Sequence, residues 1–171
     1  VMTGTNTVTT ANDTVYVSGI NTITNASGIV NASGVNTVTT ANNTVYVSGI
    51  NTITTANGTV YVTGHANTIT TAAGNTHITG YRNTVTTANG NTHITGNAIT
   101  ISSNAGKAYF TGNSATVTSG TNYLTGYSFS ISNGTNTLTS LGGSNPVTIT
   151  GGTTTITTAN ANSHITGNAI T

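Results

Sequence analysis

The chain of 171 residues carries three full charges at neutral pH, on Arg82, Lys107 and Asp13, which give it a formal net charge of +1. Charged residues make up 2% of the sequence, against roughly 25% in an ordinary domain, and Cys is absent. Two isolated cations cannot bind a run of phosphates, so we expect neither nucleic acid nor an anionic membrane as a partner. No stretch approaches the roughly 20 apolar residues of a transmembrane helix.

Near-identical segments follow one another along the chain. NTVTTANDTVYVSGI begins at Asn6, NTVTTANNTVYVSGI at Asn36 and NTITTAAGNTHITG at Asn67. A glycine recurs at a constant step at Gly4, Gly19, Gly34, Gly49 and Gly64, at a slightly longer step at Gly80, Gly96 and Gly112, and at a shorter one at Gly126. A repeat this short cannot bury an apolar side by itself, so successive repeats are expected to stack on one another.

Each repeat contains two alternating runs, such as Thr7-Val8-Thr9 and Val15-Tyr16-Val17. Alternation places successive side chains on opposite faces of a strand, and Asn and Gly between the runs suit tight corners. The residues expected to point inward from the first run are Val8, Ile23, Val38, Ile53, Ile69 and Val85. Those expected to do so from the second run are Val17, Val47, Val62, Ile78, Ile94, Phe110, Leu124 and Ile165. A column of amides that bond along the stack is expected at one corner, at Asn6, Asn21, Asn36, Asn51, Asn67 and Asn83.

We therefore predict an all-β protein without helices. It consists of one β-solenoid domain over residues 1–171, with about eleven coils of 14–16 residues and two main parallel sheets. The register is expected to be irregular around residues 127–152, where Gly142-Gly143-Ser144-Asn145-Pro146 predicts a bulging loop. An antiparallel meander or sandwich is the alternative, but such a fold has no need for near-identical residues at a fixed step.

The shortage of ionisable groups argues against an enzyme. Glycoside hydrolysis normally needs two carboxyl groups, and Asp13 is the one carboxylate side chain in the sequence. His77 and His93 are expected to be outward neighbours on adjacent coils, close enough to share a metal, but no third ligand is evident. We predict no catalytic residues, no metal and no cofactor.

An outward ladder of aromatic rings is expected on the second run. Its predicted members are Tyr16, Tyr46, Tyr61, His77, His93, Tyr109 and His164. Such rings stabilise strand pairing by stacking on one another, and Tyr is also enriched in protein interfaces. Both interpretations, self-stacking and a lateral contact surface between rods, stay open. A carbohydrate-binding adhesin that uses the Tyr residues is a further alternative.

The first run projects Thr-x-Thr outward in most coils. The predicted face comprises Thr7, Thr9, Thr22, Thr24, Thr37, Thr39, Thr52, Thr54, Thr68, Thr70, Thr84 and Thr86, with Thr116, Thr118, Thr148 and Thr150 in later coils. The N-T-V-x-x-x-N and N-T-x-x-x-G pieces resemble the Asn-x-Val-x-Gly repeats of ryegrass-type antifreeze proteins. That resemblance implies a β-solenoid whose flat Thr face binds ice. The changing step between successive repeats is expected to disturb the regularity of such a plane.

The two ends of the sequence predict a second function. Residues 1–4 (V-M-T-G) match the end of a second run, and residues 168–171 (N-A-I-T) match a first run, so two molecules could complete a shared coil. The residues predicted to carry this axial assembly are Val1, Met2, Thr3, Asn168, Ala169, Ile170 and Thr171. A contact of this kind does not close, so it propagates as a head-to-tail homopolymer.

The first residue is Val1 and not Met, and Asn-x-Ser/Thr sequons recur, which favours a secreted protein at the cell surface or outside the cell. We favour a non-catalytic structural subunit of an extracellular filament, whose partner is itself. Ice binding is the alternative function, with ice as the partner.

Overall fold

The computed structural model of the chain is an all-β rod of stacked coils. It describes residues 1–87, 89–103, 107–118, 120–132, 135–140, 147–150, 153–158, 163–166 and 169–170. The strands are β1 (Met2–Thr10), β2 (Thr14–Thr55), β3 (Thr59–Thr71), β4 (Thr76–Thr87), β5 (Thr92–Ser103), β6 (Lys107–Thr118), β7 (Thr121–Gly126), β8 (Ser128–Ser132), β9 (Thr135–Ser140), β10 (Val147–Thr150), β11 (Thr153–Thr158), β12 (Ser163–Thr166) and β13 (Ala169–Ile170). None of the described residues is helical, and none therefore belongs to a helix able to span a bilayer.

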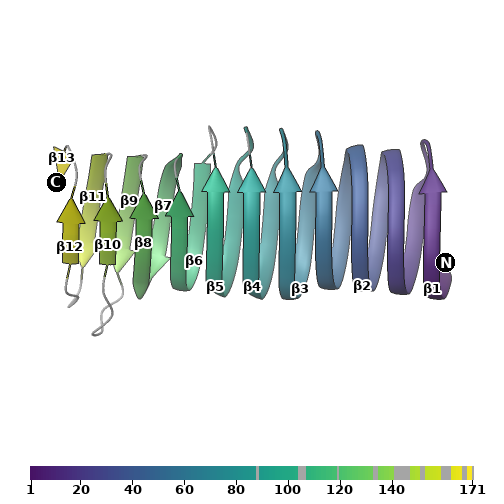
Figure 1. The fold of residues 1–171 in the computed structure, drawn as a ribbon, viewed down its shortest axis with the longest axis horizontal. Helices are drawn as coiled ribbons and strands as arrows, with labels where there is room; N and C mark the ends of the chain where they lie inside the picture. The colour runs from purple at the N-terminus through teal and green to yellow at the C-terminus, as the bar shows by residue number, and fades with distance from the viewer. Residues whose placement is uncertain are drawn as a thin grey trace.

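The coils lie side by side in a row, with the N-terminus at one end of the rod and the C-terminus at the other (Figure 1). All pairs of neighbouring strands among the described residues are parallel. β2 is 42 residues long because its backbone pairing continues around the corners of consecutive coils. The predicted β-solenoid is confirmed, and the antiparallel alternative is wrong.

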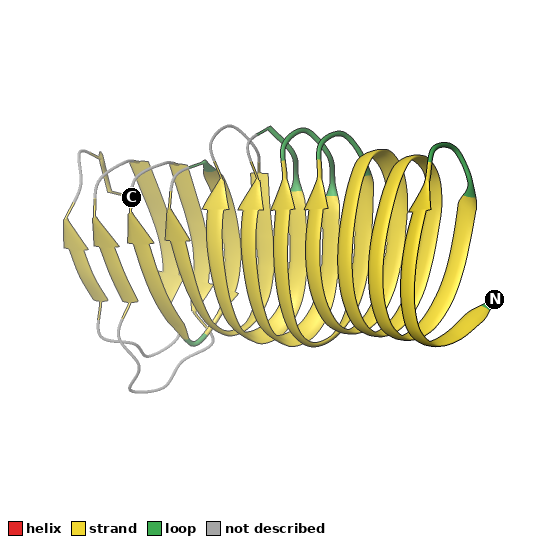
Figure 2. Cartoon of the chain, turned by 45° about the vertical axis from the view of Figure 1, so that its right-hand side comes forward, coloured by secondary structure: helices red, strands yellow, loops and turns green. Residues whose placement is uncertain are grey.

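Two flat faces run along the rod. Beyond β6 the strands divide into one series of β7, β9, β11 and β13 and another of β8, β10 and β12. We call the sheet that contains Thr7-Val8-Thr9 and β8 the Thr face, and the sheet that contains Val15-Tyr16-Val17 and β7 the ring face. The loops at residues 11–13, 56–58 and 72–75 come directly after strands of the Thr face in the sequence. They lie along one edge of the rod (Figure 2).

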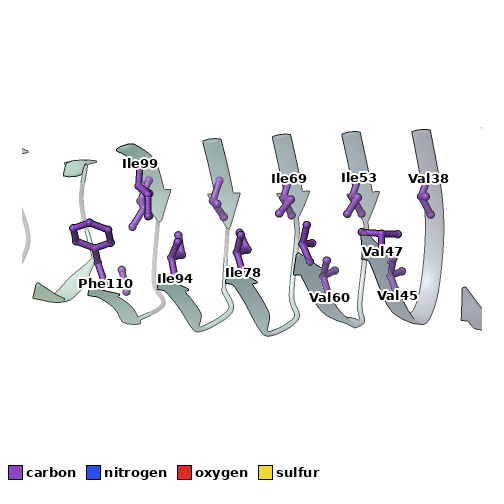
Figure 3. Close-up of a cluster of buried hydrophobic side chains, with 14 of the residues drawn as sticks. Val38, Val45, Val47, Ile53, Val60, Ile69, Ile78, Ile94, Ile99 and Phe110 are labelled. Atoms are coloured by element: carbon purple, nitrogen blue, oxygen red, sulfur yellow. The ribbon is translucent and has the colours of Figure 1, made fainter. Parts of the chain in front are cut away.

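Apolar side chains from both faces fill the interior (Figure 3). The inward column of the Thr face is Val8, Ile23, Val38, Ile53, Ile69, Val85, Ile101, Val117 and Ile131. That of the ring face includes Val17, Val47, Val62, Ile78, Ile94, Phe110 and Leu124. All these residues are 7% exposed or less, so the predicted inward residues are confirmed except for Ile165. The backbone of Ile165 pairs with that of Ile149, whose own partner is Ile131, and it therefore lies on the Thr face.

The solenoid has about eight regular turns. This count differs slightly from the predicted eleven, and parallel pairing continues through the C-terminal part as far as β12 and β13. Val147 pairs with Phe129, which is a longer step along the chain than in any preceding coil, and it falls within the range where an irregular register was expected. The predicted loop at residues 142–146 lies outside the described residues, as do Asn168 and Thr171 of the predicted axial contact.

Glycine is required at the corner that leads from the ring face into the Thr face. Gly34 has a φ of +108°, a left-handed conformation that L side chains rarely adopt. A Cβ atom there would also overlap the carbonyl oxygen of Gly19 in the preceding coil. The recurring glycine therefore allows both the turn and the close approach of successive coils.

Candidate functional site

The Thr face presents two columns of outward side chains that stay in register from coil to coil, most of them Thr. The residues on either side of each inward Val or Ile point to solvent, because side chains alternate along a strand. All twelve Thr residues predicted for this face from Thr7 to Thr86 are exposed. In later coils the same columns contain Thr100, Ser102, Thr116, Thr118, Ser130, Ser132, Thr148 and Thr150. Beyond them, the backbone of Thr148 pairs with that of His164, and the backbone of Thr150 pairs with that of Thr166. Among the described coils, neither column includes Lys, Arg, Asp or Glu.

The changing repeat length leaves this plane regular, contrary to the expectation from the sequence. A β-bulge shifts the register between Gly49 and Ile50, so that Gly49 pairs with Gly64 but Ile50 pairs with Ala66. The extra residue, His65, lies at the corner, and Thr52 still pairs with Thr68. Because the corner absorbs the insertion, the Thr columns stay in register where the step along the chain lengthens. They also stay in register where the step shortens, since Thr116 pairs with Ser130.

A buried ladder of Asn side chains supports the edge of the Thr face. The side-chain amide of each Asn donates to the side-chain oxygen of the Asn in the next coil, at 2.7–2.8 Å. The ladder runs through Asn6, Asn21, Asn36, Asn51, Asn67 and Asn83. The amide of Asn36 also donates to the carbonyl oxygen of Ser48 at 3.2 Å. Each Asn directly precedes the first outward Thr of its coil, so these bonds hold the backbone of that Thr in place.

Six rings form a continuous stack on the ring face, which we call the ring ladder. It runs through Tyr46, Tyr61, His77, His93, Tyr109 and Tyr123. Neighbouring ring centroids are 4.5–5.0 Å apart and their planes differ by 4–11°. Each strand contributes one ring, so the coil spacing sets the stacking distance.

Two predicted members of the ring ladder lie apart from this stack. Tyr16 is separated from Tyr46 by one coil, which carries Asn31 at the corresponding position. The backbone of His164 pairs with Thr148, and Thr148 pairs with Ser130, so His164 belongs to the Thr face. Pairing with β10 therefore assigns this segment to the Thr face, although its sequence copies the earlier H-I-T-G run.

The histidine pair does not form a complete metal site. No group of three or more metal-binding side chains occurs in the part of the chain that the structure describes. His77 and His93 stack with their ring centroids 5.0 Å apart, flanked by Tyr61 and Tyr109. Partial burial, and to a smaller extent the neighbouring His93, lower the pKa of His77 below its usual value. The lowered pKa favours the neutral imidazole of His77.

A second stack of rings, which was not predicted from the sequence, lies at the bulge. His65 stacks on Tyr81 at 5.1 Å, and the Arg82 guanidinium lies 6.0 Å from the centre of the Tyr81 ring. The signal for this column was the lengthening of the repeat by one residue after Gly64, which inserts an additional side chain at the corner of each coil.

The structure describes part of the predicted axial contact at each end of the rod. Met2 and Thr3 pair with Val17 and Ser18, and β1 is the terminal strand of the sheet order. Ala169 pairs with Thr153, which places β13 on the ring face rather than in the predicted first-run position.

A scan against protein-family models matches none of them, and searches of the curated proteins and of the solved structures find no significant match either.

Proposed function

We propose that the Thr face binds ice. The observation that carries this proposal is the continuous register of the two Thr columns, which the corner bulge preserves where the repeat lengthens by one residue. An ordered layer of water needs a repeating template, and a shift of a single residue within the face would turn the Thr side chains inward.

The chemistry of the columns supports the same proposal. Thr is stiff at χ1, so its methyl and hydroxyl groups stay in place without a large loss of entropy when water orders on them. The hydroxyls can bond to the water layer, and the methyl groups separate them. Charged groups would hold their own hydration shells, and the columns have no Lys, Arg, Asp or Glu among the described coils. The resemblance to ryegrass-type antifreeze repeats agrees with this proposal.

The direct test measures thermal hysteresis and ice-crystal shape with the purified chain. Thr52→Lys places a hydrated charge at the centre of the plane, so we expect hysteresis to fall by more than half and crystal faceting to disappear. Thr95→Lys is the matched control, because Thr95 is exposed on the ring face. Unaltered ice growth with the parent chain at high concentration would contradict the proposal, and so would equal losses in the two variants.

A second candidate function is a head-to-tail filament of secreted subunits. The observation in its favour is the outer edge of β1, which no described strand covers. A strand from another molecule could continue the parallel pairing there, and the low charge would oppose it little. Ala169 and Ile170 of a neighbouring molecule are the described residues expected to approach Val1, Met2 and Thr3. Negative-stain microscopy at high concentration separates the two outcomes: long fibres support this candidate, and monodisperse short rods contradict it.

A further inference from the structure

The ring face is interrupted at one coil. Tyr16 and Tyr46 are two coils apart in the same column, and Asn31 lies between them. The shorter Asn side chain leaves the outer parts of both neighbouring rings uncovered. Tyr46 is 44% exposed, and Tyr16, which borders Val1 on its other side, is 54% exposed. We call this position the ladder gap.

The ladder gap lies in a shallow, open groove on the ring face. Its volume is about 450 Å³, within the range of small-ligand sites. The groove extends past the gap on both sides, to Val1 and to Tyr61. At the gap itself, Tyr16 and Tyr46 flank Asn31, and the hydroxyls of Ser18, Ser33 and Ser48 also line the groove. The inward residue of this coil is Ala32, where the adjacent coils have Val17 and Val47. The coil with the gap therefore has smaller side chains than its neighbours on both the inner and the outer face of this strand. Among the described residues, no charged side chain lines the groove.

The dimensions of the ladder indicate what fits the groove. Two coil steps of about 4.8 Å separate the two walls by about 10 Å. A planar ring placed midway would then have its centre about 5 Å from each wall, which is the spacing of the continuous stack. The stack accepts both six-membered phenol and five-membered imidazole rings at this spacing, so it requires a flat aromatic ring and tolerates different shapes.

We propose that the ladder gap binds an uncharged, planar aromatic molecule. Its ring inserts between Tyr16 and Tyr46 and replaces the missing member of the stack. The Asn31 amide lies below the inserted ring, and the Ser33 hydroxyl lies on the same strand, where either can hydrogen-bond to a hydroxyl or N–H group on the edge of the ring. This site is distinct from the Thr face, which lies on the other sheet.

The test uses p-cresol, which carries the same ring as the Tyr side chain, and follows its proton shifts by NMR during titration with the full chain. Sandwiching between two rings should shift the p-cresol protons upfield. Asn31→Tyr fills the groove with a ring, and we expect it to weaken binding by about tenfold or more, since both stacking contacts are lost. Tyr16→Leu removes one wall and should weaken binding by a smaller factor.

Thr137→Tyr is the matched control. Thr137 follows Tyr123 in the same column, so this change adds the same ring at the far end of the ladder and leaves the groove intact. It should not alter the affinity. An equal loss in Thr137→Tyr and Asn31→Tyr would overturn the proposal, as would no detectable binding to the parent chain. Methyl glucoside serves as a second probe, and tighter binding of this sugar than of p-cresol would also overturn it.

Discussion

The buried Asn ladder and the exposed ring ladder are both columns with one side chain from each coil, yet they tolerate interruption differently. The Asn column is unbroken from Asn6 to Asn83, and its interior members are 1–4% exposed. The ring column lacks a ring at Asn31 and resumes one coil later at Tyr46. Solvent can replace a lost contact on the surface, whereas a buried amide that loses its partner has no substitute.

The way in which the Asn ladder ends supports this interpretation. Asn83 pairs with Ile99, which pairs with Ala115, and Ala115 pairs with Phe129. The corner therefore changes from amides to apolar side chains once and does not alternate between them. The ring of Phe129 meets Phe110 edge-on at 6.2 Å, so aromatic packing takes over the role of the hydrogen bonds.

The largest effect is expected from Asn36→Leu. Leu has a similar volume but cannot hydrogen-bond, so the buried Asn51 Oδ1 loses its donor in the ladder and the Asn21 amide loses one of its acceptors. We expect the free energy of unfolding to fall by about 3 kcal/mol, measured by urea denaturation.

The variant of the ring ladder to compare with Asn36→Leu is Tyr61→Ala. It removes two stacking contacts at the surface and should cost only about 1 kcal/mol. Equal losses for the two variants would contradict the proposed difference between buried and exposed columns.

An intermediate effect is expected from Ala115→Asn. The new amide would lie between Ile99 and Phe129, which offer it no hydrogen bond, so the unfolding free energy should fall by about 2 kcal/mol. Thr116→Asn introduces the same group at the neighbouring exposed position and should change stability by less than about 0.5 kcal/mol. A neutral Ala115→Asn would show that either kind of side chain suits this corner.

The smallest effect is the pH dependence caused by His77. The pKa of His77 is lowered in the folded chain, by partial burial first and by His93 second. As the pH falls through the ordinary histidine range near 6.5, the unfolded chain therefore binds protons more readily, and the folded state loses stability. The thermal midpoint should be higher at pH 7.5 than at pH 5.5, and His77→Tyr should reduce this difference. An unchanged difference in that variant would exclude His77 as its cause.

Several features were predictable because they follow from the local period. Alternation alone separated the inward Val8 and Ile23 from the outward Thr7 and Thr22, and the constant step between the first repeats predicted their stacking. The position of His164 was not predictable in this way. Its segment has the sequence of a ring-face strand, but strand pairing across the longer step at Val147 assigns it to the Thr face.

By itself, the sequence determined an all-β solenoid, the residues of its interior and the two kinds of outward side chain, because alternation and a repeat act over short distances. The tertiary structure decided where an inserted residue goes. His65 could have shifted the Thr columns, but stacking of the coils confines it to a corner, since a slip within either face would expose apolar side chains and bury polar ones. Tertiary structure also created the ladder gap at Asn31. Only the stacking of coils brings Tyr16 and Tyr46 to either side of this residue.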